Sequence, residues 1–309
     1  MTSARSLLDI GDLTVDELQT VLDLAQRPLE SLGRPLAGSG VALIFEKPSN
    51  RTRQSMEIAV AQLGGHPVYI RGDEIGFDTR EPVEDVARIM EGYHSILAAR
   101  VFVHSIVERL AAASNVPVVN MLSDWSHPLQ ALADALTMQQ CLGDLSGKTI
   151  AYVGDYNNVS RSLAEAAAML DMHVRLGCPP GFDPDEAELE RIDMLGAASI
   201  ELVPRAQDAV RGAHAVHTDT WVSMGQEDDK VARRRAFEGF TVDTKMMALA
   251  DPSAIFMHCL PAYRGFEVTA DVIDGPQSVV FQQGHNRLHA SRGLLAFLAG
   301  GSELGGEAR

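Results

Sequence analysis

The amino-acid sequence predicts an α/β protein of two domains, each built on a mainly parallel β-sheet flanked by helices. Its 309 residues are more than one hydrophobic core usually serves. Short apolar runs alternate along the chain with stretches of helical length, which is the α/β pattern. The runs are apolar on successive residues, as in parallel strands that are covered on both faces.

The predicted strands are short runs rich in aliphatic residues. In chain order they are Val41–Phe45, Pro67–Ile70, Val116–Asn120, Thr149–Val153, His173–Leu176, Ala215–Thr218 and Ile255–His258. Pro117 argues against an early start of the third strand, because proline suits only the beginning or the edge of a strand.

The predicted helices fill the segments between and beside these strands. They are Thr14–Ala25, Arg51–Leu63, Pro82–Gly92, Pro128–Cys141, Val159–Leu170, Thr244–Ala250 and Arg287–Leu298. This alternation of strands and helices is what places a parallel sheet between two helical layers.

The domain boundary is expected at the turn-like segment Leu142–Gly147, directly before a new strand. Residues 1–140 then form the first domain and residues 147–286 the second, and a C-terminal helix in residues 287–309 packs back on the first. In such folds ligands bind beyond the carboxyl ends of the strands, so we expect an active site in the cleft between the domains.

The composition disfavours several classes of protein. The net charge is −16, from 42 acidic and 26 basic residues, which repels nucleic acid and anionic membranes at long range. No run approaches the roughly 20 apolar residues that cross a bilayer, and the first nine residues lack a signal-peptide pattern. Cys141, Cys178 and Cys259 are too scattered for a disulfide framework or a zinc cluster. We therefore expect a cytoplasmic protein.

A candidate anion site follows the first strand, where the residues from Glu46 onward precede a helix. Ser49 is a favourable N-cap, and the residues after it present backbone N–H groups at the positive end of the helix. Arg51 and Arg53 are unfavourable in a first helical turn on their own, but a bound phosphate would reverse that effect. The alternative is that these arginines are solvated or paired with Glu57.

The segment Ser49-Asn-Arg-Thr-Arg resembles the Ser-Thr-Arg-Thr-Arg motif of the aspartate/ornithine carbamoyltransferase family. The resemblance implies that Ser49, Asn50, Arg51 and Thr52 bind the phosphate of carbamoyl phosphate and that Arg53 is structural. Asn50 stands where the family usually has threonine. The change is mild if this position acts through its backbone N–H.

A second group of donors lies at the start of the helix that begins with Pro128, since proline suits the first helical position. His127 and Gln130 are three residues apart and reach one side of the helix start. A lone histidine there is usually a cap or a partly buried polar residue. His-Pro-Leu-Gln, however, is similar to the family's carbamoyl-recognition motif, which implies that both side chains bind carbamoyl phosphate. Arg100 matches a further family arginine on the phosphate and the carbonyl.

The loop after Thr149–Val153 ends at Asn158 and lacks the glycine fingerprint of nucleotide-binding folds. Its asparagine is either a polar helix cap or, by resemblance to ornithine-specific family members, a ligand of the amino acid's α-substituents.

Residues 218–226 resemble the Asp-x-Trp-x-Ser-Met-Gly loop of the same ornithine-specific members. The resemblance implies that Asp219 pairs with the α-ammonium of ornithine, while Ser223 and Met224 close over it. The alternative is a surface loop with one aspartate.

Two further segments complete the resemblance. Residues 258–261 read His-Cys-Leu-Pro, which implies that Cys259 and Leu260 lie beside the carbamoyl group and the δ-amine. Outside this context a buried cysteine is usually a small hydrophobe. Residues 285–289 are similar to the family's closing Glu-Asn-Arg-x-His, which implies that Arg287 reaches carbamoyl phosphate.

The resemblance implies transfer of a carbamoyl group from carbamoyl phosphate to the δ-amine of L-ornithine, giving L-citrulline and phosphate in arginine biosynthesis. The implied catalytic residues are Arg51, Arg100, His127, Asp219 and Cys259. No metal or organic cofactor is implied, and the expected assembly is a homotrimer or a multiple of trimers. The alternatives are a carbamoyltransferase for another diamino acid, an inactive phosphate-binding paralogue, and an NAD-dependent oxidoreductase, which the missing glycines disfavour.

One segment, Gly72–Arg80, departs from the family and carries two apparent additional residues. It places Glu74 where members often have a glutamine that reaches carbamoyl phosphate in a neighbouring subunit. A carboxylate there would repel phosphate unless Arg71 or Arg80 paired with it, so Glu74 is not among the expected site residues.

Overall fold

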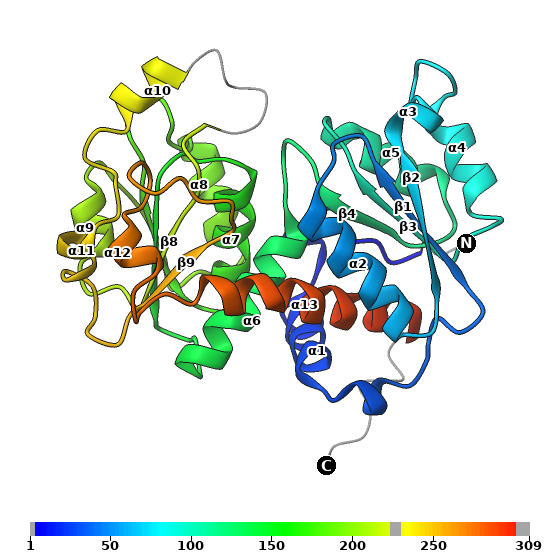
Figure 1. The fold of residues 1–309 in the computed structure, drawn as a ribbon, viewed down its shortest axis with the longest axis horizontal. Coiled ribbons are helices and arrows are strands. Elements are labelled where there is room, and N and C mark those ends of the chain that lie inside the picture. Colours follow the sequence, from blue (N-terminus) through cyan, green and yellow to red (C-terminus); the bar gives the residue numbers. More distant parts are fainter. Residues whose placement is uncertain (1–3, 223–229, 301–309) are drawn as a thin grey trace. The chain divides into compact units, whose positions relative to one another are not determined.

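The computed structural model of the chain describes residues 4–222 and 230–300. The chain divides into two units: residues 1–136 with 286–309 form unit 1, and residues 137–285 form unit 2. Each unit is a parallel sheet with helices beside it, which confirms the predicted fold class (Figure 1).

Unit 1 contains a four-stranded parallel sheet with the order β2-β1-β3-β4. Its strands are β1 (Gly40–Phe45), β2 (His66–Arg71), β3 (Ile96–Arg100) and β4 (Val118–Leu122). Its helices are η1 (Ile10–Asp12), α1 (Val15–Gln26), η2 (Leu29–Leu32), α2 (Asn50–Gln62), α3 (Gly72–Ile75), α4 (Val83–Met90) and α5 (His104–Ala113), with the first part of α6 (Pro128–Leu142) and most of α13 (Val280–Gly300). The strand order reverses between β1 and β3, where this class of fold binds ligands.

Alternate residues of the unit 1 strands face different helices, because side chains of a strand point to opposite faces of the sheet. Ala42 and Ile44 of β1 join Leu97 and Ala99 of β3 in a buried cluster with α4 and α5. Helix α2 packs against β1 and β2 instead. The core thus holds the carboxyl ends of β1 and β3 in fixed register.

Unit 2 contains a five-stranded parallel sheet with the order β7-β6-β5-β8-β9. Its strands are β5 (Thr149–Val153), β6 (His173–Gly177), β7 (Ser199–Val203), β8 (Ala215–Thr218) and β9 (Ile255–His258). Its helices are α7 (Asn158–Met169), α8 (Glu186–Asp193), α9 (Ala206–Val210), α10 (Lys230–Ala236), α11 (Thr244–Met247) and α12 (Ala270–Ile273), with the remaining parts of α6 and α13. Here the strand order reverses between β5 and β8.

Two helical layers cover the unit 2 sheet. Ala151, Val153, Val216 and Phe256 form one buried cluster with residues of α9, α11 and α12. Helices α7 and α8 pack on each other and against β6 and β7. The loops that leave β5 and β8 therefore start from a rigid base.

All seven predicted strands are present, and β3 and β7 are additional ones. The predicted strand at Val116–Asn120 begins two residues later, after Pro117, because the ring of proline removes a donor from the ladder. The sequence of β3 is rich in alanine and that of β7 alternates polar and apolar residues, so neither shows the continuous aliphatic run of a central strand. Helix α13 starts seven residues before Arg287, the first residue of the predicted helix.

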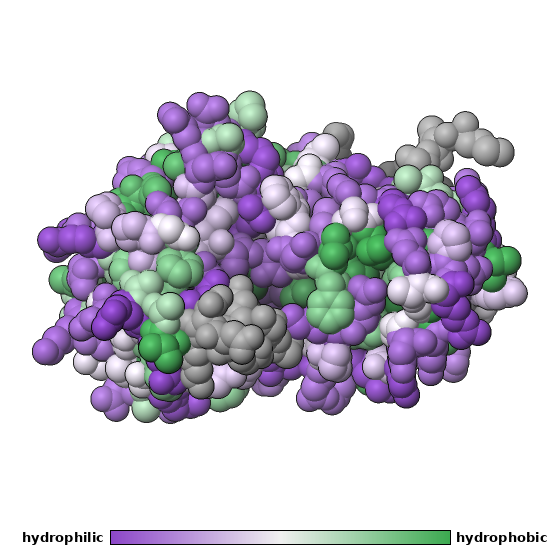
Figure 2. All heavy atoms as spheres, turned by 90° about the horizontal axis from the view of Figure 1, so that it is seen from above, coloured by the Kyte–Doolittle hydropathy of each residue, from purple (hydrophilic) through white to green (hydrophobic). Residues whose placement is uncertain are grey.

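The surface is largely hydrophilic. Polar residues dominate the face seen in Figure 2, and hydrophobic ones form small patches between them. Within residues 4–222 and 230–300, none of the helices combines the length and the hydropathy that crossing a membrane requires.

Candidate functional site

The start of α2 in unit 1 is built as the sequence predicts. Ser49 has extended backbone dihedrals, and its Oγ caps the helix by accepting from the backbone N–H of Thr52 at 3.4 Å. Arg53 Nε donates to Glu57 Oε1 at 2.8 Å, and its guanidinium lies 3.8 Å from the centre of the Tyr69 ring. Arg53 is thus held in structural contacts.

The hydroxyl of Thr52 is the point where distant parts of unit 1 meet. Arg100 Nη1 and Arg287 Nη2 both donate to Thr52 Oγ1, at 3.3 and 3.2 Å. Arg287 Nη1 also donates to Gln130 Oε1 at 2.6 Å. All four side chains are buried. Two guanidinium groups converging on one neutral hydroxyl beside a helix N-terminus form a strongly positive place, which a bound dianion would stabilise.

Arg100 owes its position to Glu46 at the end of the neighbouring strand. The backbone N–H of Glu46 donates to the carbonyl of Arg100 at 2.9 Å, and Glu46 Oε2 accepts from the backbone N–H of Phe102 at 2.9 Å. β1 and β3 are paired up to Phe45 and Arg100. The guanidinium therefore starts from the strand end next to the α2 N-terminus.

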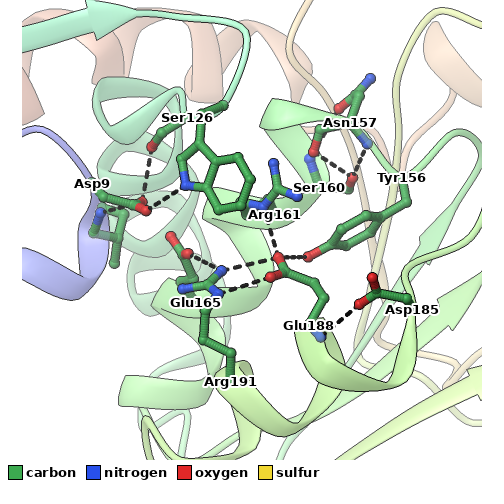
Figure 3. Close-up of polar contacts among 12 residues, drawn as sticks. Asp9, Ser126, Tyr156, Asn157, Ser160, Arg161, Glu165, Asp185, Glu188 and Arg191 are labelled. Atoms are coloured by element: carbon green, nitrogen blue, oxygen red, sulfur yellow. Dashed lines mark hydrogen bonds and ion pairs between the residues drawn. The ribbon is translucent and has the colours of Figure 1, made fainter. Parts of the chain in front are cut away.

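His127 lies directly before α6, in a segment anchored by Asp9 of unit 1. Asp9 Oδ1 accepts from Ser126 Oγ at 2.9 Å, and Asp9 Oδ2 accepts from Trp125 Nε1 at 3.1 Å (Figure 3). Burial lowers the pKa of His127 well below its usual value, and the positive charges of Arg287, Arg100 and Arg51 lower it further. Its imidazole is neutral at pH 7, so it can donate one hydrogen bond and accept another.

Unit 1 brings together most of the residues predicted to bind carbamoyl phosphate. Hydrogen bonds join five of them into one group: Ser49, Thr52, Arg100, Gln130 and Arg287. His127 lies close enough to Arg287, Arg100 and Arg51 for their charges to lower its pKa. The Asn50 amide points along α2, where its Oδ1 accepts from Gln54 Nε2 at 2.7 Å. Of the remaining predicted residues, Cys259 and Leu260 belong to unit 2.

In unit 2, three chain segments meet at the carboxylate of Asp219. Its Oδ1 accepts from the Cys259 thiol at 2.9 Å and from the backbone N–H of Thr220 at 2.7 Å. Asn157 Nδ2 donates to its Oδ2 at 3.3 Å. Thr218 and His258 are paired across β8 and β9, so Asp219 and Cys259 leave adjacent strands at the same level. The carboxylate is suited to a cationic group.

The segment that follows β9 is fixed by buried polar contacts. Gln283 Oε1 accepts from the backbone N–H of His258 at 2.8 Å. His258 Nδ1 accepts from the backbone N–H of Leu260 at 2.9 Å, and Glu267 Oε1 lies 3.3 Å from His258 Nε2. Leu260 itself has a φ of 56°, which is unusual for a leucine. These contacts set the direction of the Cys259 thiol.

Two neighbouring asparagines share the loop after β5. Asn157 is the N-cap of α7, with its Oδ1 accepting from the N–H groups of Val159 and Ser160 at 2.9 and 3.2 Å. Asn158, the predicted ligand of the amino acid, is the first residue of the helix. Asn157, whose side-chain Nδ2 donates to the Asp219 carboxylate, was missed in the sequence analysis.

An ionic cluster in unit 2 supports that loop. Tyr156 and Arg161 donate to Glu188 Oε1 at 2.6 and 2.7 Å, and Arg191 donates to Glu188 Oε2 at 2.8 Å (Figure 3). Arg191 also reaches the fully buried Glu165 at 2.5 Å. The cluster joins α7 to α8 and fixes Tyr156 next to Asn157.

Ser223 and Met224, which were predicted to close over ornithine, lie outside the described residues. The segment before them is anchored by Arg233 of α10. Arg233 Nη1 donates to the carbonyl of Trp221 at 3.0 Å and to Asp155 Oδ2 at 2.7 Å.

Within the described part of the chain, one group of side chains has the composition of a metal site. Asp219, His258 and Cys259 each place a potential ligand atom within 4.8 Å of the others. The thiol already donates to Asp219, and both His258 nitrogens have hydrogen-bonding neighbours. Internal hydrogen bonds thus explain the arrangement of the group.

The Gly72–Arg80 segment of unit 1 is stabilised by contacts with three arginines. Arg71 Nε donates to Asp73 at 2.9 Å, Arg80 Nη1 donates to the carbonyl of Glu74 at 3.0 Å, and Arg109 bridges Asp78 and Glu84. Glu74 Oε2 accepts from the backbone N–H of Arg71 at 3.3 Å. Arg71 thus contacts the Glu74 carboxylate through its backbone N–H, and the Arg80 guanidinium contacts the backbone carbonyl of Glu74.

The comparisons with known proteins agree across both units. The model of the carbamoyl phosphate-binding domain of aspartate/ornithine carbamoyltransferases matches residues 5–140, and the model of the aspartate/ornithine-binding domain matches residues 146–298. Ornithine carbamoyltransferase from Acidothermus cellulolyticus is 47% identical over 302 residues, which are 95% of this chain and 96% of that protein.

Two further relatives extend the similarity. Ornithine carbamoyltransferase from Thermus thermophilus is 45% identical over 300 residues, with 96% of this chain and 98% of the relative covered. The solved structure of the enzyme from Pyrococcus furiosus superposes with a TM-score of 0.91 at 42% identity, covering 97% of this chain and 98% of that one.

Proposed function

The chain belongs to the aspartate/ornithine carbamoyltransferase family, and from that premise we propose that it transfers the carbamoyl group of carbamoyl phosphate to the δ-amine of L-ornithine. The products are L-citrulline and phosphate. The observation that carries this proposal is the meeting of Arg100 and Arg287 at the hydroxyl of Thr52, with Arg287 also bonded to Gln130. Relatives with the same full-length similarity are ornithine carbamoyltransferases, including an anabolic one.

The donor binds in unit 1. The phosphate of carbamoyl phosphate takes the N-terminus of α2, with Ser49, Asn50, Arg51 and Thr52 around it. The guanidinium groups of Arg100 and Arg287 neutralise its charge, because each presents several N–H donors in a planar fork. The neutral His127 donates to the carbamoyl oxygen, and Gln130 binds the same group.

The acceptor binds in unit 2. Asp219 pairs with the α-ammonium of ornithine in a charge-assisted contact. Asn158 and the neighbouring Asn157 contribute amide groups, and Ser223 and Met224 close over the substrate. The Cys259 thiol and the carbonyl groups near Leu260 orient the δ-amine.

The chemistry requires a neutral amine. The δ-ammonium of ornithine, like that of lysine, has a pKa of about 10, and desolvation lowers it on binding. The amine nitrogen then attacks the carbamoyl carbon, and Arg100, His127 and Thr52 stabilise the resulting oxyanion. Each well-placed donor contributes roughly 3–4 kcal/mol. The bond to phosphate breaks, Arg51, Arg100 and Arg287 hold the leaving group, and the departing phosphate takes the amine proton.

The working form is a homotrimer or a multiple of trimers in the cytoplasm, and the reaction runs toward arginine synthesis. The support for the assembly is the resemblance of the whole chain to the family, whose members are trimers with sites at subunit interfaces. Light scattering of the purified protein tests the assembly, and a monomer at micromolar concentration would contradict it.

One assay tests the reaction. Purified protein is incubated with carbamoyl phosphate and a panel of amines that includes ornithine, lysine, putrescine and N-acetylornithine, and ureido product and phosphate are measured together. We expect equal amounts of citrulline and phosphate from ornithine and little product from the other amines. Product from another amine, or phosphate binding without turnover, would overturn the assignment.

A further inference from the structure

One buried carboxylate near the donor-binding residues has no part in the proposed reaction. Asp134 lies in α6, one helical turn after Gln130, and its exposed fraction is 0%. An ionised carboxylate in such a place must be matched by hydrogen bonds, because burial without them is strongly unfavourable. Gln130 Nε2 supplies one of these bonds, with a length of 2.7 Å.

This bond decides which way the Gln130 amide points. The two ends of an amide have nearly the same shape, so its partners determine its orientation. A carboxylate only accepts hydrogen bonds, so the NH₂ end faces Asp134 and the carbonyl end faces Arg287. That carbonyl is the acceptor for Arg287 Nη1, at 2.6 Å.

The Arg287 guanidinium also donates a second hydrogen bond. Arg287 Nη2 donates to Thr52 Oγ1, so two acceptors at different positions define the plane of the group. If the Gln130 amide turned over, its NH₂ would face the guanidinium, and one of the two acceptors would be lost. The orientation of Arg287 therefore depends on a carboxylate that it does not need to touch.

We propose that Asp134 is a positioning residue for the carbamoyl phosphate site, acting through the Gln130 amide on the guanidinium of Arg287. The inference rests on the proposed function, because it assigns Arg287 to the donor. It adds that Gln130 serves the site in two ways, as a ligand of the carbamoyl group through its second N–H and as the acceptor that aims Arg287.

The test is a double-mutant cycle with the nearly isosteric change Asp134→Asn. In the wild-type background we expect the KM for carbamoyl phosphate to rise about fivefold, because an amide accepts the bond more weakly and also allows the reverse orientation. The KM for ornithine should stay within about twofold of wild type, since Asp219 and its neighbours are unchanged. In a Gln130→Leu background, Asp134→Asn should change the KM for carbamoyl phosphate by less than about 1.5-fold.

Glu165→Gln provides the matched control, because Glu165 is an equally buried helical carboxylate that contacts Arg191 of unit 2. It should lower the melting temperature without raising the KM for carbamoyl phosphate more than about twofold. A selective effect of Asp134→Asn that vanishes in the Gln130→Leu background supports the inference. Equal factors in both backgrounds, equal changes in both KM values, or no change at all would overturn it. Wild-type enzyme that makes no citrulline in this assay would instead refute the proposed function.

Discussion

The donor region of unit 1 and the acceptor region of unit 2 occupy the same place in their sheets but carry opposite charge. Each lies where the strand order reverses, between β1 and β3 in one unit and between β5 and β8 in the other. The donor region gathers Arg100 and Arg287 around a neutral hydroxyl, whereas the acceptor region gathers a thiol and an amide around Asp219. One architecture thus gathers cations in one unit and a carboxylate in the other, as the proposed binding of an anhydride dianion and an ammonium group requires.

A third region contains partly buried arginines whose role is structural. Arg161 and Arg191 donate to the carboxylates of Glu188 and Glu165, so each guanidinium meets a charge of opposite sign. Arg100 and Arg287 instead donate to hydroxyl and amide oxygens. These bonds to neutral oxygens orient the two guanidinium groups without themselves neutralising the charge.

The largest effect should follow from removing a donor-region charge. Arg100→Met keeps the length of the side chain but deletes the guanidinium, so kcat/KM for carbamoyl phosphate should fall about 10³-fold. Steady-state kinetics measure this, with Arg88→Gln as the control, because Arg88 pairs with Asp85 on the surface of α4. If a folded Arg100→Met enzyme lost less than tenfold in kcat/KM for carbamoyl phosphate, the role proposed for the donor region would be contradicted.

A substitution in the acceptor region should change the kinetics for ornithine rather than those for carbamoyl phosphate. Asp219→Asn removes the charge that binds the α-ammonium, so the KM for ornithine should rise roughly 10- to 100-fold while that for carbamoyl phosphate changes much less. Asp208→Asn, which alters an exposed carboxylate beside Arg205, is the control. If the Asp219→Asn variant bound ornithine normally yet lost all activity, a protein base would explain the result better than phosphate does.

A substitution in the ionic cluster around Glu188 should change the free energy of unfolding. Burial alone would raise the pKa of Glu188, but hydrogen bonds from Arg191, Tyr156 and Arg161 outweigh it and lower that pKa to about 2. A lowered pKa stabilises the fold above the unfolded value of about 4.5 and ceases to do so as the pH falls toward 2. Glu188→Gln should therefore reduce the free energy of unfolding by about 2 kcal/mol at pH 7, and by about 0.8 kcal/mol less at pH 4.

Urea denaturation at the two pH values measures this difference. Glu201→Gln is the control, since Glu201 is exposed and lies 3.8 Å from Arg175. An effect of Glu188→Gln that did not depend on pH would show that the cluster acts by packing alone.

The smallest effect concerns the carboxylate that departs from the charge pattern of the donor region. Glu74→Gln should lower the KM for carbamoyl phosphate by up to about threefold at low ionic strength, because exposed charges interact weakly. Asp73→Asn alters a neighbouring carboxylate that pairs with Arg71 and should have less effect. A higher KM after Glu74→Gln would indicate that this carboxylate supports the site.

The sequence predicted contiguous features well and tertiary ones poorly. The cap at Ser49 and the placement of His127 before Pro128 depend on neighbouring residues, so a pattern reveals them. The contact of Arg287 with Thr52 spans 235 positions, which local spacing does not describe, and only the family resemblance pointed to it. Asp134 was missed because it lies outside the His-Pro-Leu-Gln motif, within a short apolar stretch of α6.

Smaller differences have equally local causes. Asn158 was predicted as a ligand of the amino acid, with a helix cap as the alternative. The cap is instead Asn157, because capping preference does not distinguish two adjacent asparagines. Strands β3 and β7 escaped prediction because β3 is rich in alanine and β7 includes a charged residue, and strand propensity depends strongly on packing context.

The neutral state of His127 has a consequence for how the rate responds to alkalinity. Burial, together with the surrounding cations, lowers the pKa of His127 so far that the imidazole stays uncharged throughout the neutral range and contributes no ionisation there. The δ-amine of ornithine has a pKa of about 10 in solution. Between pH 7 and that pKa, log(kcat/KM) for ornithine should therefore rise with the fraction of free ornithine whose δ-amine is deprotonated. The ionisation of ornithine, rather than that of a side chain of the enzyme, then sets how kcat/KM rises with pH.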